Sequence, residues 1–270
     1  AGNYSLTQPS LTDGEIIAKS ITVTANSDQT KVYGAADPVL TYTVAPDLIT
    51  GDVLTGALAR ATGENVGTYA ISQGTLNNTN YNITFVPANF AITAKPLTIS
   101  GLTATSKTYD QTTAAAIIGT PSLEGVVGGD VVTLTGTPVG AFADAKAEAD
   151  KPVTVSGLSL AGDDAGNYSL TPLILTANIN KVALTVSGAT SNSKTYDGNT
   201  TTTANFGSAV LAGILDGETV SLTTTNYSAT FDNKNVGTGK TVTISGLTLD
   251  GANAGNYSLT QPSLTDGEII

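Results

Sequence analysis

Residues Ala1–Ile17 read AGNYSLTQPSLTDGEII, and residues Ala254–Ile270 repeat the same letters without one change. β-Structure tolerates wide substitution on its exposed face, so a shared fold alone does not produce such identity. The offset between the two copies is 253 residues. We therefore infer a recent duplication in units of that length, and the chain predicts a tandem array of repeats.

Three shorter units fill this period. The last two units share segments at offsets of 87, 88 and 89 residues, and such small drifts are typical of single-residue insertions in surface loops. A more distant first unit carries a similar series of motifs. The shared segments are Lys107-Thr-Tyr-Asp110 with Lys194-Thr-Tyr-Asp197, Gly129–Thr135 with Gly217–Thr223, and Val153–Leu158 with Val242–Leu247; the first unit has Lys31-Val-Tyr-Gly34, Gly51-Asp52 and Asn65-Val-Gly67.

These repeats predict domain boundaries. Cutting before each opening strand gives three domains at residues 18–94, 95–180 and 181–270. Residues 1–17 are then the closing segment of a preceding repeat. We expect this orphan tail to be poorly ordered, because a lone strand leaves its backbone groups unpaired.

Alternation of apolar residues with Thr or Ser dominates the chain, as in Ile21-Thr-Val-Thr-Ala25 and Leu184-Thr-Val186. A period of two indicates strands with one buried face, and the regular Gly, Asn and Asp interruptions are typical of small β folds. The sequence predicts a mostly β chain of three small tandem β domains, each an Ig-like sandwich or a β-grasp-like sheet with a short crossing helix. The helical signals are weak, at Ala141–Asp150 and Val210–Leu215.

The predicted domains follow one another almost without linkers. Ile92 is separated from Leu97 by only four residues, and Ile179 from Val182 by two. Pro96 fixes the φ angle of the first joint, whereas flexible linkers are rich in Gly and Ser. The sequence therefore predicts restricted bending and an elongated rod.

Composition excludes several classes of function. The chain has 11 basic and 22 acidic residues, for a formal net charge of −11. Nucleic acid and anionic membrane surfaces require a basic footprint, so neither is an expected partner. No apolar run approaches the ~20 residues that span a bilayer. We expect a monomeric fragment whose partners are neighbouring repeats of the same chain.

The motifs also resemble known repeat families. The last two units, with Tyr109-Asp110 and Tyr196-Asp197-Gly198 near their starts and Ala-Gly-Asn-Tyr-Ser-Leu-Thr at their ends, resemble the YDG domain. The first unit, with Val32-Tyr-Gly-Ala-Ala-Asp-Pro38, looks like the MBG domain of the Tyr-Gly type. Both families occur in large bacterial surface or secreted proteins, often filamentous haemagglutinin-like. The resemblance implies an adhesin stalk on the cell surface, associated with biofilm, and supplies no catalytic residues.

Catalysis is not expected. The chain contains no His and no Cys, which removes the commonest general base, the commonest metal ligand and the thiol nucleophile. A glycosidase-like carboxylate pair requires a cleft between two acidic residues, and repeats of this size offer little room for one. We predict no catalytic, cofactor-binding or metal residues and no enzyme activity.

Calcium is the one cofactor that the residue types allow, because it needs only oxygen ligands. The candidates are two loops, Asp163 with Asp164 and Asn167, and Asp250 with Asn253 and Asn256. Neither loop has EF-hand spacing. Asp and Asn also favour such loops through side-chain bonds to the backbone, so we expect turns without an ion.

The tyrosines recur at two places in each unit. Repeated tyrosines form a sugar-stacking platform in some proteins, but a position repeated in every unit more often packs the core and bonds its hydroxyl to nearby backbone. We expect core packing here. The two sets are Tyr81, Tyr168 and Tyr257, each following an Asn, and Tyr33, Tyr109 and Tyr196, each following the opening strand.

Two covalent modifications were considered and neither is expected. Asn-X-Ser/Thr sequons occur at Asn77, Asn82, Asn167, Asn199 and Asn226, but a Thr-rich and Asn-rich chain produces chance matches. A Lys–Asn isopeptide bond would resist pulling, yet the candidate lysines, Lys95 and Lys181, begin their domains instead of lying mid-strand.

Three hypotheses of function remain. The first is a non-catalytic extracellular spacer that projects a distal adhesive domain from the bacterial cell. The second is a multivalent binding module in which each repeat weakly contacts a glycan, a host or matrix protein, or a neighbouring stalk. The third is an accessory domain of a secreted enzyme. A binding module should expose aromatic side chains on one face of each unit, whereas a spacer should bury its tyrosines.

Overall fold

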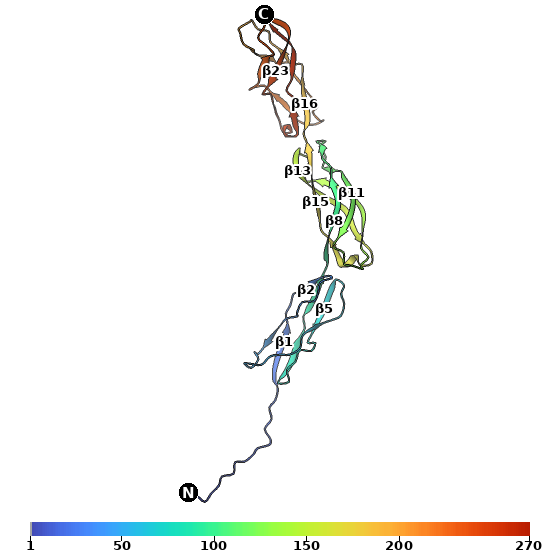
Figure 1. Ribbon diagram of the computed structural model, residues 1–270, viewed down its shortest axis with the longest axis vertical. Helices are drawn as coiled ribbons and strands as arrows, with labels where there is room; N and C mark the ends of the chain where they lie inside the picture. Colours follow the sequence, from blue (N-terminus) through green and yellow to red (C-terminus); the bar gives the residue numbers. More distant parts are fainter. Residues whose placement is uncertain (1) are drawn as a thin grey trace. The chain divides into compact units, whose positions relative to one another are not determined.

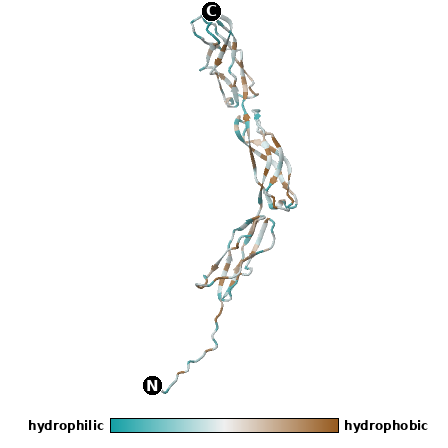
Figure 2. Cartoon of the chain, in the orientation of Figure 1, coloured by the Kyte–Doolittle hydropathy of each residue, from teal (hydrophilic) through white to brown (hydrophobic). Residues whose placement is uncertain are grey.

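The structure, a computed structural model, describes residues 2–270 (Figure 1). Its secondary structure consists of β-strands and two three-residue 3-10 helices, and no α-helix occurs among the described residues. The prediction of a mostly β chain of small tandem domains is confirmed. Apolar segments (brown in Figure 2) are interspersed with polar ones along the strands, which is the pattern of strands with one buried face.

The chain divides into two compact units. The first contains the residues up to Leu97 together with Leu123–Thr133 and Leu160–Thr171. The second contains Thr98–Ser122, Leu134–Ser159 and Pro172–Ile270. Each unit therefore holds one end of the predicted middle repeat beside a neighbouring repeat.

The first unit contains the strands of residues 18–94 and a short strand from the middle repeat. Its strands are β1 (Lys19–Ala25), β2 (Gln29–Val32), β3 (Tyr42–Ala45), β4 (Ala59–Arg60), β5 (Gly67–Ser72), β6 (Tyr81–Val86), β7 (Asn89–Thr93) and β14 (Tyr168–Leu170), preceded by the helix η1 (Ala165–Asn167). The start of β8 (Lys95–Ala104) pairs in parallel with β14 in this unit.

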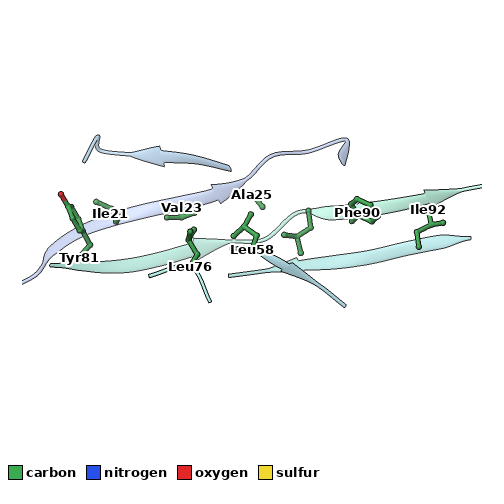
Figure 3. Close-up of a cluster of buried hydrophobic side chains, with 9 residues drawn as sticks. Ile21, Val23, Ala25, Leu58, Leu76, Tyr81, Phe90 and Ile92 are labelled. Carbon is green, nitrogen blue, oxygen red and sulfur yellow. The ribbon is translucent and has the colours of Figure 1, made fainter. Parts of the chain in front are cut away.

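Two sheets enclose the core of residues 18–94. The strand orders are β3-β1-β6 and β2-β7-β5-β4. Every second residue of β1 is buried, at Ile21, Val23 and Ala25, and these pack with Phe90 and Ile92 of the other sheet. Figure 3 shows the buried side chains in a row along the strands. The absence of a crossing helix in this described repeat favours the sandwich alternative over the β-grasp one.

The second unit contains the rest of the middle repeat and the whole last repeat. Its strands are β9 (Lys107–Thr108), β10 (Ala114–Ala115), β11 (Ile117–Glu124), β12 (Thr133–Phe142), β13 (Glu148–Ala161), β15 (Leu173–Asn180), β16 (Val182–Ser187), β17 (Thr190–Ser191), β18 (Thr201–Thr202), β19 (Ala204–Asn205), β20 (Val210–Ala212), β21 (Ser221–Thr223), β22 (Ser228–Phe231), β23 (Gly237–Ser245), β24 (Thr248–Asp250), β25 (Tyr257–Leu259) and β26 (Ser263–Ile269), with η2 (Ala254–Asn256) before β25. β11, β12 and β13 each extend by one or two residues into the first unit.

The larger sheets of the second unit have the orders β10-β12-β13-β15-β9 and β18-β22-β23-β26. Buried apolar residues again occupy alternate positions, as Val242 and Ile244 do in β23. Ile179 of β15 and Ile269 of β26 are 2% and 1% exposed. The closing strand of each repeat therefore ends in the core.

One scaffold recurs in all three repeats. In each repeat the first strand pairs in parallel with a strand near the end of the repeat, namely β1 with β6, β8 with β14 and β16 with β25. The closing tyrosine begins the later strand and lies opposite the first residue of the earlier one. The registers are Lys19↔Tyr81, Lys95↔Tyr168 and Val182↔Tyr257 at one end, and Lys31↔Ile92, Lys107↔Ile179 and Lys194↔Ile269 at the other. Because parallel strands start at the same edge, each repeat has its closing tyrosine at one end and its opening tyrosine at the other.

Both helical signals of the sequence were wrong. Ala141 and Phe142 end β12, residues 143–146 form bends, and Glu148 begins β13. Val210–Ala212 form β20, paired with β16. The Ala-rich stretch is a connection between adjacent strands of one sheet, so sheet pairing overrides the local helix propensity of Ala, Lys and Glu.

Residues 2–17 form no strand or helix, and all of them are exposed. Tyr4, Leu6 and Ile16 are 98%, 87% and 101% exposed. The identical residues at the other end, Tyr257 and Ile269, are 2% and 1% exposed. The same letters thus lie in a core only where the body of a repeat is present. No helix among residues 2–270 is long and apolar enough to cross a bilayer.

Candidate functional site: two tyrosine–carboxylate junctions

The first unit contains a junction between residues 18–94 and the middle repeat, built on one carboxylate. Tyr168 at the start of β14 is buried, and its hydroxyl accepts a hydrogen bond from the Val127 amide at 3.0 Å. The same hydroxyl donates to Asp130. Tyr33, which follows β2, donates its hydroxyl to Asp130 Oδ2 at 2.9 Å. Two tyrosines from different repeats therefore share one acidic side chain.

The rings of this pair are also in contact. The centroids of Tyr33 and Tyr168 lie 5.3 Å apart at an interplanar angle of 73°, which is the favoured edge-to-face arrangement. Gly34 makes the close approach possible. It has a φ of +78°, and a Cβ there would lie 2.8 Å from Cγ2 of Val127, so the Tyr-Gly pair of the first repeat suits this contact.

An asparagine joins the same two repeats a second time. Asn167 is buried, and its Oδ1 accepts a hydrogen bond from the Val66 amide at 2.9 Å. Its Nδ2 donates to Asn65 Oδ1 at 3.3 Å. Asn167 precedes the closing Tyr168 in the chain, so one short segment supplies both contacts.

The second unit contains an equivalent junction between the middle and last repeats. Tyr109 and Tyr257 are 7% and 2% exposed, and both donate their hydroxyls to the carboxylate of Glu218. Their ring centroids lie 6.0 Å apart at 78°. The Tyr257 hydroxyl accepts from the Leu215 amide at 3.0 Å. Asn253 Nδ2 donates to Glu218 Oε1 at 3.1 Å, which adds a donor that the first junction lacks among the described residues.

The asparagine contact is repeated as well. Asn256 Oδ1 accepts a hydrogen bond from the Ala147 amide at 3.0 Å, and Gln111 Nε2 donates to the Asp216 carbonyl at 3.0 Å. Tyr109 and Tyr257 belong to one continuous cluster of buried apolar residues, which also includes Phe142 of the middle repeat and Leu184 of the last. The apolar core of this unit therefore continues across the junction, beside its polar contacts.

We call the two contributing surfaces the plug and the socket. The plug is the opening tyrosine with the hairpin amide, namely Tyr33 with Val66 and Tyr109 with Ala147. The socket is the closing tyrosine, its acidic partner and the preceding asparagine, namely Tyr168, Asp130 and Asn167, or Tyr257, Glu218 and Asn256. Each junction inserts one plug into one socket.

The electrostatics keep the tyrosine hydroxyls protonated. The hydrogen bond to Asp130 raises the pKa of Tyr33 to about 12. Burial, followed by the hydrogen bond to Glu218, raises the pKa of Tyr109 to about 12. Burial is also the main cause that raises the pKa of Tyr168 and of Tyr257. A neutral phenol is a donor, whereas a phenolate beside a carboxylate would repel it.

A buried lysine holds each plug loop. Lys31 Nζ lies 2.5 Å from Glu64 Oε2, in the loop before Val66. Lys151 contacts the Asp144 carboxylate and the Lys146 carbonyl, the latter at 3.0 Å, in the loop before Ala147. These lysines are 8% and 3% exposed. Loop groups balance the charge of both lysines, with Asp37 as a further partner of Lys31, so the hairpin amides are presented in a fixed place.

The loops considered for calcium serve these junctions. Asp164 Oδ2 accepts a hydrogen bond from the Val131 amide at 2.8 Å, and Asn253 Oδ1 from the Thr219 amide at 3.1 Å. Asn167 and Asn256 accept the hairpin amides. Asp163 and Asp250 make no side-chain hydrogen bond among the described residues. No cluster of three acidic side chains suited to a metal occurs in residues 2–270. These contacts reach backbone amides 33 to 109 residues away in the chain, so the side chains tie their loops to other segments and do not form local turns.

The prediction that the tyrosines pack in the core is confirmed for five of the six positions and wrong for the last. Tyr81, Tyr109, Tyr168 and Tyr257 are buried, and Tyr33 is half-buried against the core. Tyr196 is 51% exposed. The hydroxyls of Tyr81, Tyr168 and Tyr257 accept from backbone amides as expected, but the donation of tyrosine hydroxyls to a carboxylate was not foreseen.

Asp130 and Glu218 are the functional residues that sequence reasoning missed. The signal was present, because an acidic residue follows Gly at Gly51-Asp52, Gly129-Asp130 and Gly217-Glu218 in the three aligned repeats. Their opening-tyrosine partners lie 97 and 109 residues away in the chain and their closing-tyrosine partners 38 and 39, so no local pattern joined the acids to the tyrosines.

The residues considered for modification have ordinary surroundings. Asn167 is buried at the first junction, so its side chain is not accessible for glycosylation. Lys95 is half-buried and Lys181 exposed, and neither has a side-chain hydrogen bond to an asparagine within residues 2–270. Within residues 2–270 the buried lysines are Lys31, Lys151 and Lys240.

The fold and junctions define a tandem array of small β repeats, in which each of the two units contains one junction between neighbouring repeats. The YDG domain family model matches residues 93–174 and 180–264, more than half of the chain, and the model of the MBG domain (YGX type) matches residues 21–91. The chain therefore belongs to the YDG domain family, with an MBG-type first repeat, as the motifs indicated. No curated protein matches the chain. Domains of these kinds are repeat domains of surface proteins and are not known as catalytic families.

Proposed function

We propose that this chain is a non-catalytic spacer in the stalk of a bacterial cell-surface adhesin, where it projects a distal adhesive domain. The observation that carries the proposal is the junction, which appears twice with the same parts: two tyrosines on one carboxylate and one asparagine on a hairpin amide. Each repeat in such an array binds its neighbour, and extracellular length is gained by adding repeats.

Several features of the junction suit a spacer. A single covalent linker restricts direction poorly, whereas a linker with two lateral contacts restricts both bending and twisting. The shared carboxylate accepts charge-assisted hydrogen bonds, which are about twice as strong as neutral ones. The apolar cluster around Tyr109 and Tyr257 adds burial to the contact. These contacts support an extended array with limited bending between repeats.

The alternative is a multivalent module that binds a glycan, a matrix protein or a neighbouring stalk. Such a module would present an aromatic platform on each repeat. In residues 18–270 the large exposed apolar side chains are mostly scattered Val and Ile, and Tyr196 is the exposed aromatic among them. A platform repeated in every unit is therefore absent from this described part, and the spacer is the better supported function.

Small-angle X-ray scattering of the chain tests the proposal. A compact body of 270 residues should have a radius of gyration of about 18 Å. Three units placed end to end, each with strands of ~33 Å, should give roughly 30 Å. We expect the larger value, unchanged when calcium is replaced by a chelator. A value near the compact limit would overturn the spacer and redirect attention to a binding cleft.

A further inference from the structure

The last repeat carries a plug that has no socket among the described residues. Tyr196 follows the opening strand as Tyr33 and Tyr109 do, and the backbone places it in the same way. Its amide donates to the Ile270 carbonyl at 2.7 Å, as Tyr33 donates to Thr93 at 2.9 Å and Tyr109 to Asn180 at 2.8 Å. Yet Tyr196 is 51% exposed, while Tyr109 is 7% exposed.

The hairpin loop of this plug has the same features as the loops of the first two plugs. Asn235-Val236-Gly237 has the same letters as Asn65-Val66-Gly67 of the first plug. Lys240 is buried, and its Nζ donates to Asn233 Oδ1 at 2.7 Å. It thereby holds the loop as Lys151 holds the loop before Ala147. Val236 is 65% exposed and its amide has no hydrogen-bond partner in residues 2–270.

The first repeat carries the matching unoccupied socket. Tyr81 is buried, its hydroxyl accepts from the Ile49 amide at 2.9 Å, and it donates to Asp52 Oδ2 at 2.7 Å. These are the contacts that Tyr168 makes with Val127 and Asp130. Asn80 precedes Tyr81 and is exposed, and its carboxamide has no partner in the described residues. Asn167 and Asn256 hold hairpin amides from the equivalent place.

The identical segments at the two ends of the sequence indicate how the plug of one copy and the socket of the next would be connected in one chain. Residues 254–270 are the same as residues 1–17, which lead directly into residue 18. A second copy that continues from its Ala18 immediately after Ile270 therefore repeats a connection already present in the chain. Covalent linkage raises the effective concentration of the two surfaces, so a contact too weak to hold free copies together still forms in tandem.

We propose that the exposed plug of Tyr196 and Val236 docks into the socket of Tyr81, Asp52 and Asn80 on a second copy of this chain placed in tandem. The Tyr196 hydroxyl donates to Asp52 of the second copy, and the Val236 amide donates to Asn80 Oδ1 of the second copy. This inference deepens the proposed function and rests on it, since it names the partner of the unoccupied plug and of the unoccupied socket. It makes the MBG-type and YDG-type repeats interchangeable at the junction.

Amide hydrogen exchange measured by NMR tests the contact. The sample is the full chain extended after Ile270 by a second copy of residues 18–94, compared with the unextended chain. We expect the Val236 amide to exchange roughly tenfold more slowly in the extended chain, in line with one added hydrogen bond in an ordered contact. Equal exchange in the two chains would overturn the proposal.

The same substitution in either copy provides a matched control. Asn80→Ala in the second copy removes the acceptor and should return the Val236 amide to the rate of the unextended chain. Asn80→Ala in the first copy changes an identical local environment and should leave that rate unchanged. Slow exchange that survives the second-copy substitution would contradict the assigned contact. Unchanged exchange within β23 in every variant verifies that the last repeat remains folded.

The Ala147 amide in the same spectra separates this inference from the proposed function. Ala147 donates to Asn256 at the second junction. If the Ala147 amide is protected from exchange and the Val236 amide is not, the proposed junction between two copies is wrong and the proposed spacer function is unaffected. If neither amide is protected, the junctions themselves fail, and the spacer loses the observation that carries it.

Discussion

At the scale of single residues, the junctions show why a tyrosine and not a phenylalanine occupies these positions. Asp130 and Glu218 are half-buried, and a carboxylate that loses part of its hydration needs hydrogen-bond donors to offset the desolvation cost. Asp130 and Glu218 each receive two phenol hydroxyls, one from each of two repeats. Neither repeat alone satisfies the carboxylate fully, so the acid couples the two repeats.

This coupling predicts a loss of stability at high pH. The pKa of Tyr33 and of Tyr109 is about 12 in the folded chain, against about 10 in an unfolded one. Since the folded pKa is raised, the stabilisation is complete below pH ~10 and is lost as the pH rises toward ~12. A titration of the chain with 13C-labelled tyrosine, followed by NMR, should show both rings ionising in that range.

Glu218→Gln is the discriminating variant for this titration. It removes the negative charge beside Tyr109 and leaves Tyr33 with Asp130, so the pKa of Tyr109 should fall while that of Tyr33 stays the same. A Tyr109 midpoint near 10 in the unsubstituted chain would contradict the hydrogen bond to Glu218. Equal shifts of both tyrosines in the variant would show that the carboxylates act globally and not as local partners.

Residue types predicted part of this site. The recurring tyrosines and asparagines were visible, and burial of the closing tyrosines follows from their repetition before a strand. The acid that joins them was not identified, because its tyrosine partners come from two repeats. Tyr196 was expected in the core like its equivalents. Its burial requires the socket of a neighbouring repeat, and residues 181–270 provide no socket for it, so it is exposed.

At the scale of strands and loops, the ion cluster behind the first plug has a defined role. Asp37 bonds to Arg60 Nε at 2.7 Å and lies 2.6 Å from Lys31 Nζ, while Glu64 bonds to the same two cations. These pairs fix the loop before Val66 to strands β2 and β4. Because the two cations are nearly buried and the two acids half-exposed or exposed, the acids are needed to balance the cations.

This cluster predicts acid sensitivity in the first repeat. The hydrogen bond from Arg60, followed by that from Lys31, lowers the pKa of Asp37 to about 2. A lowered folded pKa stabilises the repeat above pH ~4, and that contribution disappears as the pH falls toward ~2. Asp37 is 44% exposed, so solvent screening keeps the effect below about 2 kcal/mol.

Urea unfolding at pH 5 and at pH 2.5, read from NMR signals of β1 and β5, measures this effect. The unsubstituted repeat should lose stability between the two values, and Asp37→Asn should be less stable at pH 5 and lose less stability on acidification, with Glu64 accounting for a remaining loss. Asp28→Asn is a matched control, since Asp28 contacts no cation in the described chain. An equal acid loss in the Asp37 and Asp28 variants would refute the role of the cluster.

Alternation predicted the strands well, because each strand has one buried face and that pattern is local. The parallel pairing of opening and closing strands was not predicted, since strands such as β1 and β6 are separated by most of a repeat and register depends on distant partners. The Ala-rich segment 141–150 looked helical for the same reason. Its ends belong to β12 and β13, whose sheet also contains β9, β10 and β15, and these partner strands lie outside the segment.

At the scale of the molecule, the recurrence of one scaffold and one junction describes a chain extended by repetition. Residues 18–94 and the YDG repeats differ in length and in most letters, yet all place the closing tyrosine at one end and the opening tyrosine at the other. Such a design lets units be duplicated without new contacts, which agrees with the identical segments 1–17 and 254–270. Stability in arrays of this kind depends on the interfaces between neighbours as well as on each repeat.

The central claim is that the tyrosine–carboxylate junctions make neighbouring repeats move as one body. 15N relaxation of the full chain measures it most directly, as a rotational correlation time for each repeat. We expect residues 95–180 and 181–270 to share one correlation time and Glu218→Ala to separate them, while residues 18–94 and 95–180 remain coupled through Asp130. Separate correlation times for the repeats of the unsubstituted chain would contradict the account.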